Sequence, residues 1–205
     1  MMIPDDQISY TGPPADLTLM KELPEELQNI LREKNGFIAY EGGLHVRGAC
    51  TEPAWHSIHT VWKGELALSK TYDALPADAV PFAEDCMGDP FVLRDKKVYR
   101  LTLETAYMEI LGSLAEFFES IARDPRGVLH YEPLLKLKQQ GSGLKPGQLI
   151  HAYPPYSTAQ AANGVLLRAV PADAQIAYEL DFFASVRDLP EGQTFRLKIL
   201  PDEFA

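Results

Sequence analysis

Between residues 80 and 103, apolar and polar positions alternate with a period of two. Such alternation is typical of β-strands that bury one face. Carboxylates and Gly88 interrupt the pattern at 84–89, and charged residues interrupt it again at 95–97. We therefore predict strands joined by tight turns, the first of which is acidic. The alternating positions are Phe82, Phe91, Leu93, Val98, Tyr99 and Leu101.

Other segments carry apolar residues at the spacing of amphipathic helices. They predict helices over residues 24–33, 53–62, 111–122 and 171–186. Gly36 can end the first helix, because glycine readily adopts positive φ. Ser113 and Glu116 have the spacing of a capping box, in which each side chain satisfies a backbone N–H at the start of a helix. Short strands are expected at 37–40 and 44–46.

Glycine, proline and polar residues suggest how the chain is divided. The predicted order is a flexible lead-in (1–16), a main domain (17–138), a linker (139–146) and a C-terminal extension (147–205). Within the extension, a strand at 165–170, a helix and a strand at 195–199 predict a β-α-β unit. Its length of about 35 residues suits a right-handed crossover between parallel strands.

The chain has 205 residues and a formal net charge of −10. A surface that binds DNA or RNA must be basic to displace counterions, so we expect no direct contact with nucleic acid. An acidic balance serves solubility, or it complements a basic partner and speeds the encounter with it.

Cys50 and Cys86 are too few for a disulfide framework, which favours a reducing compartment. The N-terminus lacks the basic and apolar regions of a signal peptide. No segment approaches the ~20 apolar residues that span a bilayer. We therefore expect a cytoplasmic protein with no membrane partner and an oligomeric state that the sequence leaves open.

Glu84, Asp85 and Asp89 are the most conspicuous candidates for chemistry. Paired carboxylates can perform acid–base catalysis, but side chains adjacent on a strand point to opposite faces, which is a poor geometry for a dyad. Asp and Glu also stabilise turns by local hydrogen bonds. A turn, a partner-binding surface and a catalytic pair are the three interpretations, and the first is the simplest.

His56 and His59 are three residues apart on a predicted helix and could share a metal ion. No third ligand has a diagnostic spacing, so we predict no metal site, no cofactor and no catalytic residue. Trp55, Trp62 and Tyr72 could form an aromatic binding patch or part of the core. Cys86 lies among carboxylates, which would raise the pKa of its thiol rather than activate it.

The order of these segments resembles the SMI1/KNR4 family, also called the SUKH superfamily. The resemblance covers roughly residues 20–123. Its matching segments are Leu23-Pro24-Glu25-Glu26-Leu27, Asn35-Gly36, Gly42-Gly43-Leu44, Phe82-Ala83-Glu84-Asp85, Gly88-Asp89, Phe91, Leu93, Lys97-Val98-Tyr99-Arg100-Leu101, Glu104-Thr105 and the helix from Ser113 to Ile121. Pro90 departs from the polar residue usual in the family, and its missing N–H predicts a strand start or an edge.

The resemblance implies an α+β fold with a central mixed, mainly antiparallel sheet flanked by helices, to which the β-α-β extension is added. Bacterial members are similar to immunity proteins, which neutralise a cognate toxin, often a nuclease, by occlusion. Fungal members resemble signalling scaffolds. A non-enzymatic binding protein with a basic protein toxin as its partner is therefore expected, a scaffold is the alternative, and a carboxylate- or histidine-based hydrolase or metal enzyme is a third. The expected partner-binding residues are Glu84, Asp85, Asp89, Trp55 and Tyr72.

Overall fold

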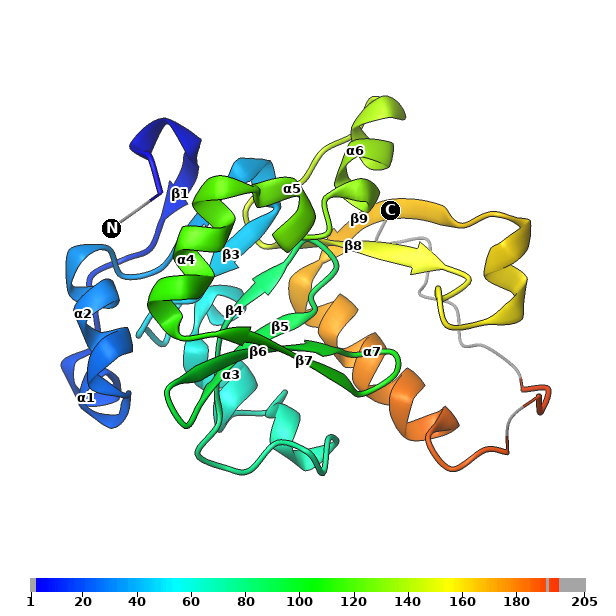
Figure 1. The fold of residues 1–205 in the computed structure, drawn as a ribbon, viewed down its shortest axis with the longest axis horizontal. Coiled ribbons are helices and arrows are strands. Elements are labelled where there is room, and N and C mark those ends of the chain that lie inside the picture. Colours follow the sequence, from blue (N-terminus) through cyan, green and yellow to red (C-terminus); the bar gives the residue numbers. More distant parts are fainter. Residues whose placement is uncertain (1–2, 191, 196–205) are drawn as a thin grey trace.

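The computed structural model describes residues 3–190 and 192–195. Its strands are β1 (Ile8–Thr11), β2 (Phe37–Ala39), β3 (Leu44–Val46), β4 (Val80–Asp85), β5 (Pro90–Arg94), β6 (Lys97–Thr102), β7 (Tyr107–Gly112), β8 (Gln148–Tyr153) and β9 (Leu166–Pro171). β1 to β7 form one sheet in chain order, and each strand pairs antiparallel with the next (Figure 1). β8 and β9 form a second, two-stranded sheet. The α+β fold is confirmed, with an antiparallel rather than a mixed sheet.

The predicted acidic turn joins β4 to β5. Asp85 ends β4, Pro90 begins β5, and Gly88 lies between them with a φ of +95°. A proline at the first residue of a strand removes no ladder hydrogen bond inside it, so the expectation of a strand start is confirmed. The next turn joins β5 to β6 and places Asp95 and Lys96 in the left-handed region.

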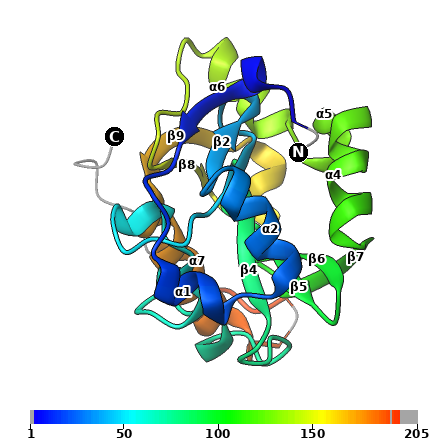
Figure 2. The same ribbon diagram turned by 90° about the vertical axis from the view of Figure 1, so that its left-hand side faces the viewer.

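Helices cover both faces of the large sheet. They are α1 (Leu17–Glu22), α2 (Glu25–Glu33), α3 (Ile58–Trp62), α4 (Leu114–Arg123), α5 (Pro125–Val128), α6 (Glu132–Gln139) and α7 (Ala172–Val186). α4 and α7 lie on opposite sides of the sheet, as Figure 1 and Figure 2 show. Among the described residues, no helix combines the length and the apolar character of a membrane span.

Successive side chains of a strand enter two different cores. On β5, Phe91 and Leu93 belong to the larger core, whereas Val92 between them belongs to a second core. α4 contributes to the larger core and α7 to the second, where Ile176 is buried. This alternation is the period of two that the sequence shows.

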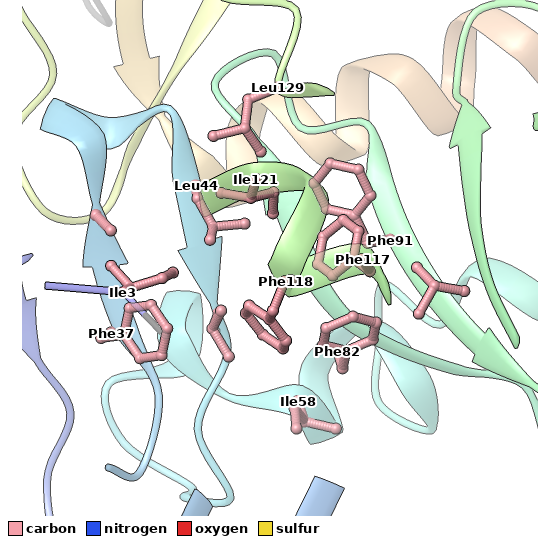
Figure 3. Close-up of a cluster of buried hydrophobic side chains, with 14 of the residues drawn as sticks. Ile3, Phe37, Leu44, Ile58, Phe82, Phe91, Phe117, Phe118, Ile121 and Leu129 are labelled. Carbon is pink, nitrogen blue, oxygen red and sulfur yellow. The ribbon is translucent and has the colours of Figure 1, made fainter. Parts of the chain in front are cut away.

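The larger core has an aromatic centre (Figure 3). The ring of Phe117 lies 4.7 Å from the ring of Phe91 and 5.8 Å from that of Phe82, measured between centroids. Such pairs add ~0.5–1.5 kcal/mol to the free energy of area burial. The predicted buried stripe of α4 is confirmed and consists of Leu114, Phe117, Phe118 and Ile121. The predicted capping box of Ser113 and Glu116 is also present.

The prediction of one helix over 53–62 is wrong in its middle. Ala54–His56 is a single 3-10 turn, and α3 begins only at Ile58. Ser57 between them is extended, with φ −72° and ψ 128°. Its hydroxyl donates to the carbonyl of Cys50 and accepts from the N–H of His59, so the residue ends one turn and caps the next.

Two further expectations need correction. Within the predicted lead-in over residues 1–16, the described residues from Ile3 onward are not loose, because β1 pairs with β2 and Ile3 is buried in the larger core. β7 was not predicted, and the expected start of a helix at Leu111 belongs to this strand. Its exposed outer residues obscure the alternation that marks a half-buried strand.

The C-terminal region contains the predicted strand as β9 and the predicted helix as α7. β9 pairs antiparallel with β8, which the sequence did not indicate. The last predicted strand, at 195–199, lies outside the described residues except for Phe195. A parallel partner for β9 therefore stays a prediction.

Candidate functional site

Glu84 is the first of the three candidate carboxylates, Glu84, Asp85 and Asp89, and it is buried in an ion pair. Glu84 on β4 lies opposite His45 on β3 in the sheet register. Nε and Nη2 of Arg47 donate to the two carboxylate oxygens at 2.8 and 2.9 Å. Nη1 of Arg47 donates to the carbonyls of Trp55 and Ser57. Bidentate pairing of this kind is the geometry in which a buried charge is best compensated.

Two histidines extend this pair into a buried polar cluster of Asn35, His45, Arg47, His56 and Glu84. His45 Nδ1 lies 2.8 Å from a carboxylate oxygen of Glu84, and His45 Nε2 lies 2.8 Å from His56 Nδ1. His56 Nε2 lies 3.2 Å from the backbone carbonyl of Asn35. All five side chains are buried.

Burial and charge act in opposite directions within the cluster. Burial raises the pKa of Glu84, but Arg47 and His45 outweigh it and hold this pKa below its usual value. Burial lowers the pKa of His45, and the hydrogen bond to the Glu84 carboxylate offsets that effect only in part, so this pKa stays below its usual value. The pKa of His56 is lowered to about 4 by burial and by neighbouring His45.

The other two candidate carboxylates, Asp85 and Asp89, stabilise the β4–β5 turn by accepting backbone hydrogen bonds. Asp85 accepts the backbone N–H groups of Met87 and Asp89 at 2.9 and 3.1 Å, and Asp89 accepts that of Leu103 at 2.9 Å. Burial raises the pKa of Asp85 to about 6, although Arg100 opposes it. Burial and neighbouring Asp85 raise the pKa of Asp89 well above its usual value. Asp85 and Asp89 therefore have the geometry expected of carboxylates that stabilise a turn.

These positions leave little of the expected partner surface available. Glu84 and Asp85 are 2% and 1% exposed, and Tyr72 is 1% exposed with its hydroxyl donating to the carbonyl of Leu103. Direct contact with a partner would require side chains at the surface. Trp55 differs, because it is only partly buried and its ring lies 5.2 Å from that of Tyr10.

The structure separates the two histidines that were candidates for a metal site. His56 is buried, whereas His59 is exposed, because the extended residue between their turns removes the helical spacing. Among the described residues, no group of three or more His, Cys, Asp or Glu side chains could hold a metal ion. Cys50 and Cys86 are buried free thiols, and burial raises the pKa of Cys50 to about 11.

A cleft of about 330 Å³ reaches the buried polar cluster from one side. Ser9, Ile38 and His45 line it from the sheet, and Lys138 of α6 lines it from the opposite side. The segment between α6 and β8 forms a further part of the wall. Since both ring nitrogens of His45 already face partners within the protein, the cleft offers a ligand no free imidazole nitrogen.

A group of five carboxylates gathers at a different place, at the surface. A cleft of about 670 Å³ lies between the start of α2, the loop before β4 and the β5–β6 turn. Its acidic lining consists of Glu22, Glu25, Glu26, Asp78 and Asp95. Arg94 and Lys96 are its basic side chains, and Arg94 lies 3.3 Å from the carboxylate of Asp95. We call this the acidic cleft. Apolar residues, among them Leu23 and Trp62, form part of its wall.

Comparisons with known proteins bear on the fold. No family model and no curated protein matches the chain. Among solved structures, the chain is similar to Atu4351 from Agrobacterium tumefaciens, with a TM-score of 0.55 and 16% sequence identity over 85% of this chain and 86% of that one. At this identity the likeness shows the fold alone. The resemblance to the SMI1/KNR4 family stays a prediction.

Proposed function

We propose that this chain is a non-enzymatic binding protein that neutralises a basic protein toxin by occluding it. The observation that carries the proposal is the acidic cleft, where five carboxylates surround apolar wall residues at the surface. Glu25 and Glu26 of this cleft belong to the segment that carries the family resemblance around α2.

The cleft has the features of a docking surface for a basic partner. Its five carboxylates outnumber its two basic side chains, and an excess of negative charge around an apolar floor steers an oppositely charged protein and disfavours wrong partners. Trp62 is largely buried beneath the rim, and Lys63 lies 3.8 Å from its ring centroid. A stable complex would bury about 1,600 Å² in total, so the surface beyond the cleft must also contribute.

The different positions of the carboxylates in the fold support the choice of the acidic cleft as the docking surface. The carboxylates of the Phe-Ala-Glu-Asp segment stabilise the interior and the turn, whereas those near α2 face solvent. A protein partner would therefore contact the carboxylates near α2. The expectation that this partner is a nuclease comes from the family resemblance and not from this geometry.

Affinity capture tests the proposal. The tagged protein is recovered from its native cells at low and then moderate salt, and the bound proteins are identified by mass. One stoichiometric basic partner, toxic when expressed without this chain, is the expected result. Several substoichiometric partners would favour a scaffold. Conversion of a small substrate by the purified chain, with many turnovers per protein molecule, would overturn the non-enzymatic assignment.

A further inference from the structure

The buried polar cluster contains a row of three contacts that needs more protons than two neutral histidines supply. The row starts at Glu84, passes through His45 and His56, and ends at the backbone carbonyl of Asn35. Both ends accept hydrogen bonds and donate none, because Arg47 holds Glu84 as a carboxylate and a carbonyl has no proton. Three hydrogen bonds therefore need three N–H donors from two rings.

Two neutral imidazoles carry only two N–H groups. Whichever nitrogens hold them, one of the three contacts then brings two lone pairs together at 2.8–3.2 Å. Such a contact is repulsive and leaves buried acceptors without donors. A third proton turns every contact into a hydrogen bond. The carboxylate of Glu84, 2.8 Å from His45 Nδ1, favours placing the positive charge on His45 rather than on His56.

We propose that His45 is a buried imidazolium, whose extra proton fastens Glu84, His56 and Asn35 into one continuous row. His56 is then neutral, with its proton on Nε2 and its Nδ1 accepting from His45. Burial is the main reason for the lowered pKa of His56, and a positive His45 beside it acts in the same direction, because a neighbouring cation disfavours a second one.

The groups around His45 set the balance of charge. Glu84 favours the proton and Arg47 opposes it. Glu41, Lys138 and Lys145 line the adjoining cleft, and Glu41 and Lys138 form an ion pair there.

The remaining neighbours of the row carry no charge that would displace the proton. Cys50 stays a neutral thiol, because burial raises its pKa to about 11. The pKa of Tyr10 is also raised by burial. The ring of Trp55, whose centroid lies 5.5 Å from that of His45, favours a cation. Burial lowers the pKa of His45 and so opposes the proposal. The row's geometry favours it, because only the extra proton completes all three hydrogen bonds.

Three glycines leave the space that the ring of His56 occupies. A Cβ at Gly12 would lie 2.2 Å from His56 Nε2, one at Gly36 2.6 Å, and one at Gly48 2.8 Å. The ring thus fills a space that three separate chain segments leave for it. Loss of the proton would therefore remove a hydrogen bond at the point where the segments before α1, before β2 and after β3 meet.

Nitrogen NMR of the imidazole groups tests the protonation directly. In the full chain at pH 7, long-range proton–nitrogen correlation spectra are expected to show both nitrogens of His45 protonated. For His56, Nε2 should be protonated and Nδ1 not. The single variants His45→Gln and His59→Gln assign the signals of the buried and the exposed ring. One unprotonated nitrogen on His45 at pH 7 would overturn the proposal.

The pH dependence of folding gives a second, independent readout. A proton held by folded His45 means a folded-state pKa above the unfolded value of about 6.5. The associated stability is complete below pH 6.5 and is lost as pH rises through the folded-state pKa. The folding equilibrium constant should thus fall roughly tenfold for each pKa unit gained.

Two variants isolate this contribution. His45→Gln keeps a donor toward His56 but has no titrating proton, so the difference in stability between wild type and variant should shrink with rising pH. His59→Gln should keep the wild-type dependence. A parallel decline in wild type and His45→Gln, or a difference that instead shrinks below pH 6.5, would contradict the buried imidazolium.

Discussion

Arg47 determines how the interior tolerates a carboxylate. Its guanidinium makes two hydrogen bonds to Glu84 and two more to the carbonyls of Trp55 and Ser57, so its donors are used on all sides. A carboxylate at 2% exposure is stable only with such compensation. Glu84 is therefore a structural residue whose partner lies 37 positions away in the sequence.

Replacing Arg47 with methionine should strongly destabilise the protein. The substitution keeps an apolar stem but leaves Glu84 buried without its cation, which costs about 3–5 kcal/mol. Urea unfolding at pH 7 measures the loss. Arg94→Met is the matched control, because the Arg94–Asp95 pair is largely exposed and should contribute less than ~1 kcal/mol. Equal losses in both variants would contradict the assigned role.

Asp89→Asn should stabilise the protein at pH 8. In the folded state the pKa values of Asp85 and Asp89 are raised, so their stabilising protonated forms are lost as pH rises through those values. Asparagine keeps the acceptor for the N–H of Leu103 and removes one charge. The gain should be roughly 1.4 kcal/mol per unit of raised pKa and should vanish near pH 4. Urea unfolding across this range tests it, and a gain that is constant with pH would contradict the electrostatic cause.

At the scale of elements, α4 shows what local sequence determines. Ser113 caps the helix, and the carboxylate of Glu116 accepts a hydrogen bond from the N–H of Ser113 at 2.7 Å. The spacing of the apolar residues determines which face is buried. These signals involve residues within one or two turns of each other, so they can be recognised without knowledge of the fold.

Ser113→Ala should lower the free energy of unfolding by about 1 kcal/mol, because the N–H of Glu116 loses its capping oxygen. Chemical denaturation measures the change. Ser120→Ala within the same helix makes the same chemical change away from the cap and should be close to neutral. A comparable loss at both positions would show that the effect is not due to capping.

Elements that depend on distant partners were harder to predict. β7 exposes much of its surface, so its apolar residues show no clear alternation. β8 is recognisable only through its pairing with β9, and the short β1 only through its pairing with β2. In residues 53–62 the apolar spacing is helical, but Ser57 bonds to Cys50 and breaks the helix. Long-range contacts override the local pattern in each case.

Across the whole molecule, the sequence predicted an acidic α+β protein and drew attention to carboxylates that the fold buries. Glu84 and Asp85 stand out because they interrupt an apolar run, and that same run buries them on β4. Glu25, Asp78 and Asp95 are far apart in the sequence and meet only after α2 packs beside the β5–β6 turn. Net charge is a property of composition, but its clustering is a property of the fold.

Charge reversal at the acidic cleft should abolish capture of a basic partner. Glu25→Lys with Asp78→Lys changes the local charge by four units, so we expect binding to weaken at least tenfold at low salt, with a smaller effect at moderate salt. Titration calorimetry with the captured partner measures this. The control is Glu132→Lys with Asp173→Lys, which makes the same total change at the first turns of α6 and α7. If both double variants weaken binding equally, net charge rather than the cleft is recognised, and the docking surface lies elsewhere.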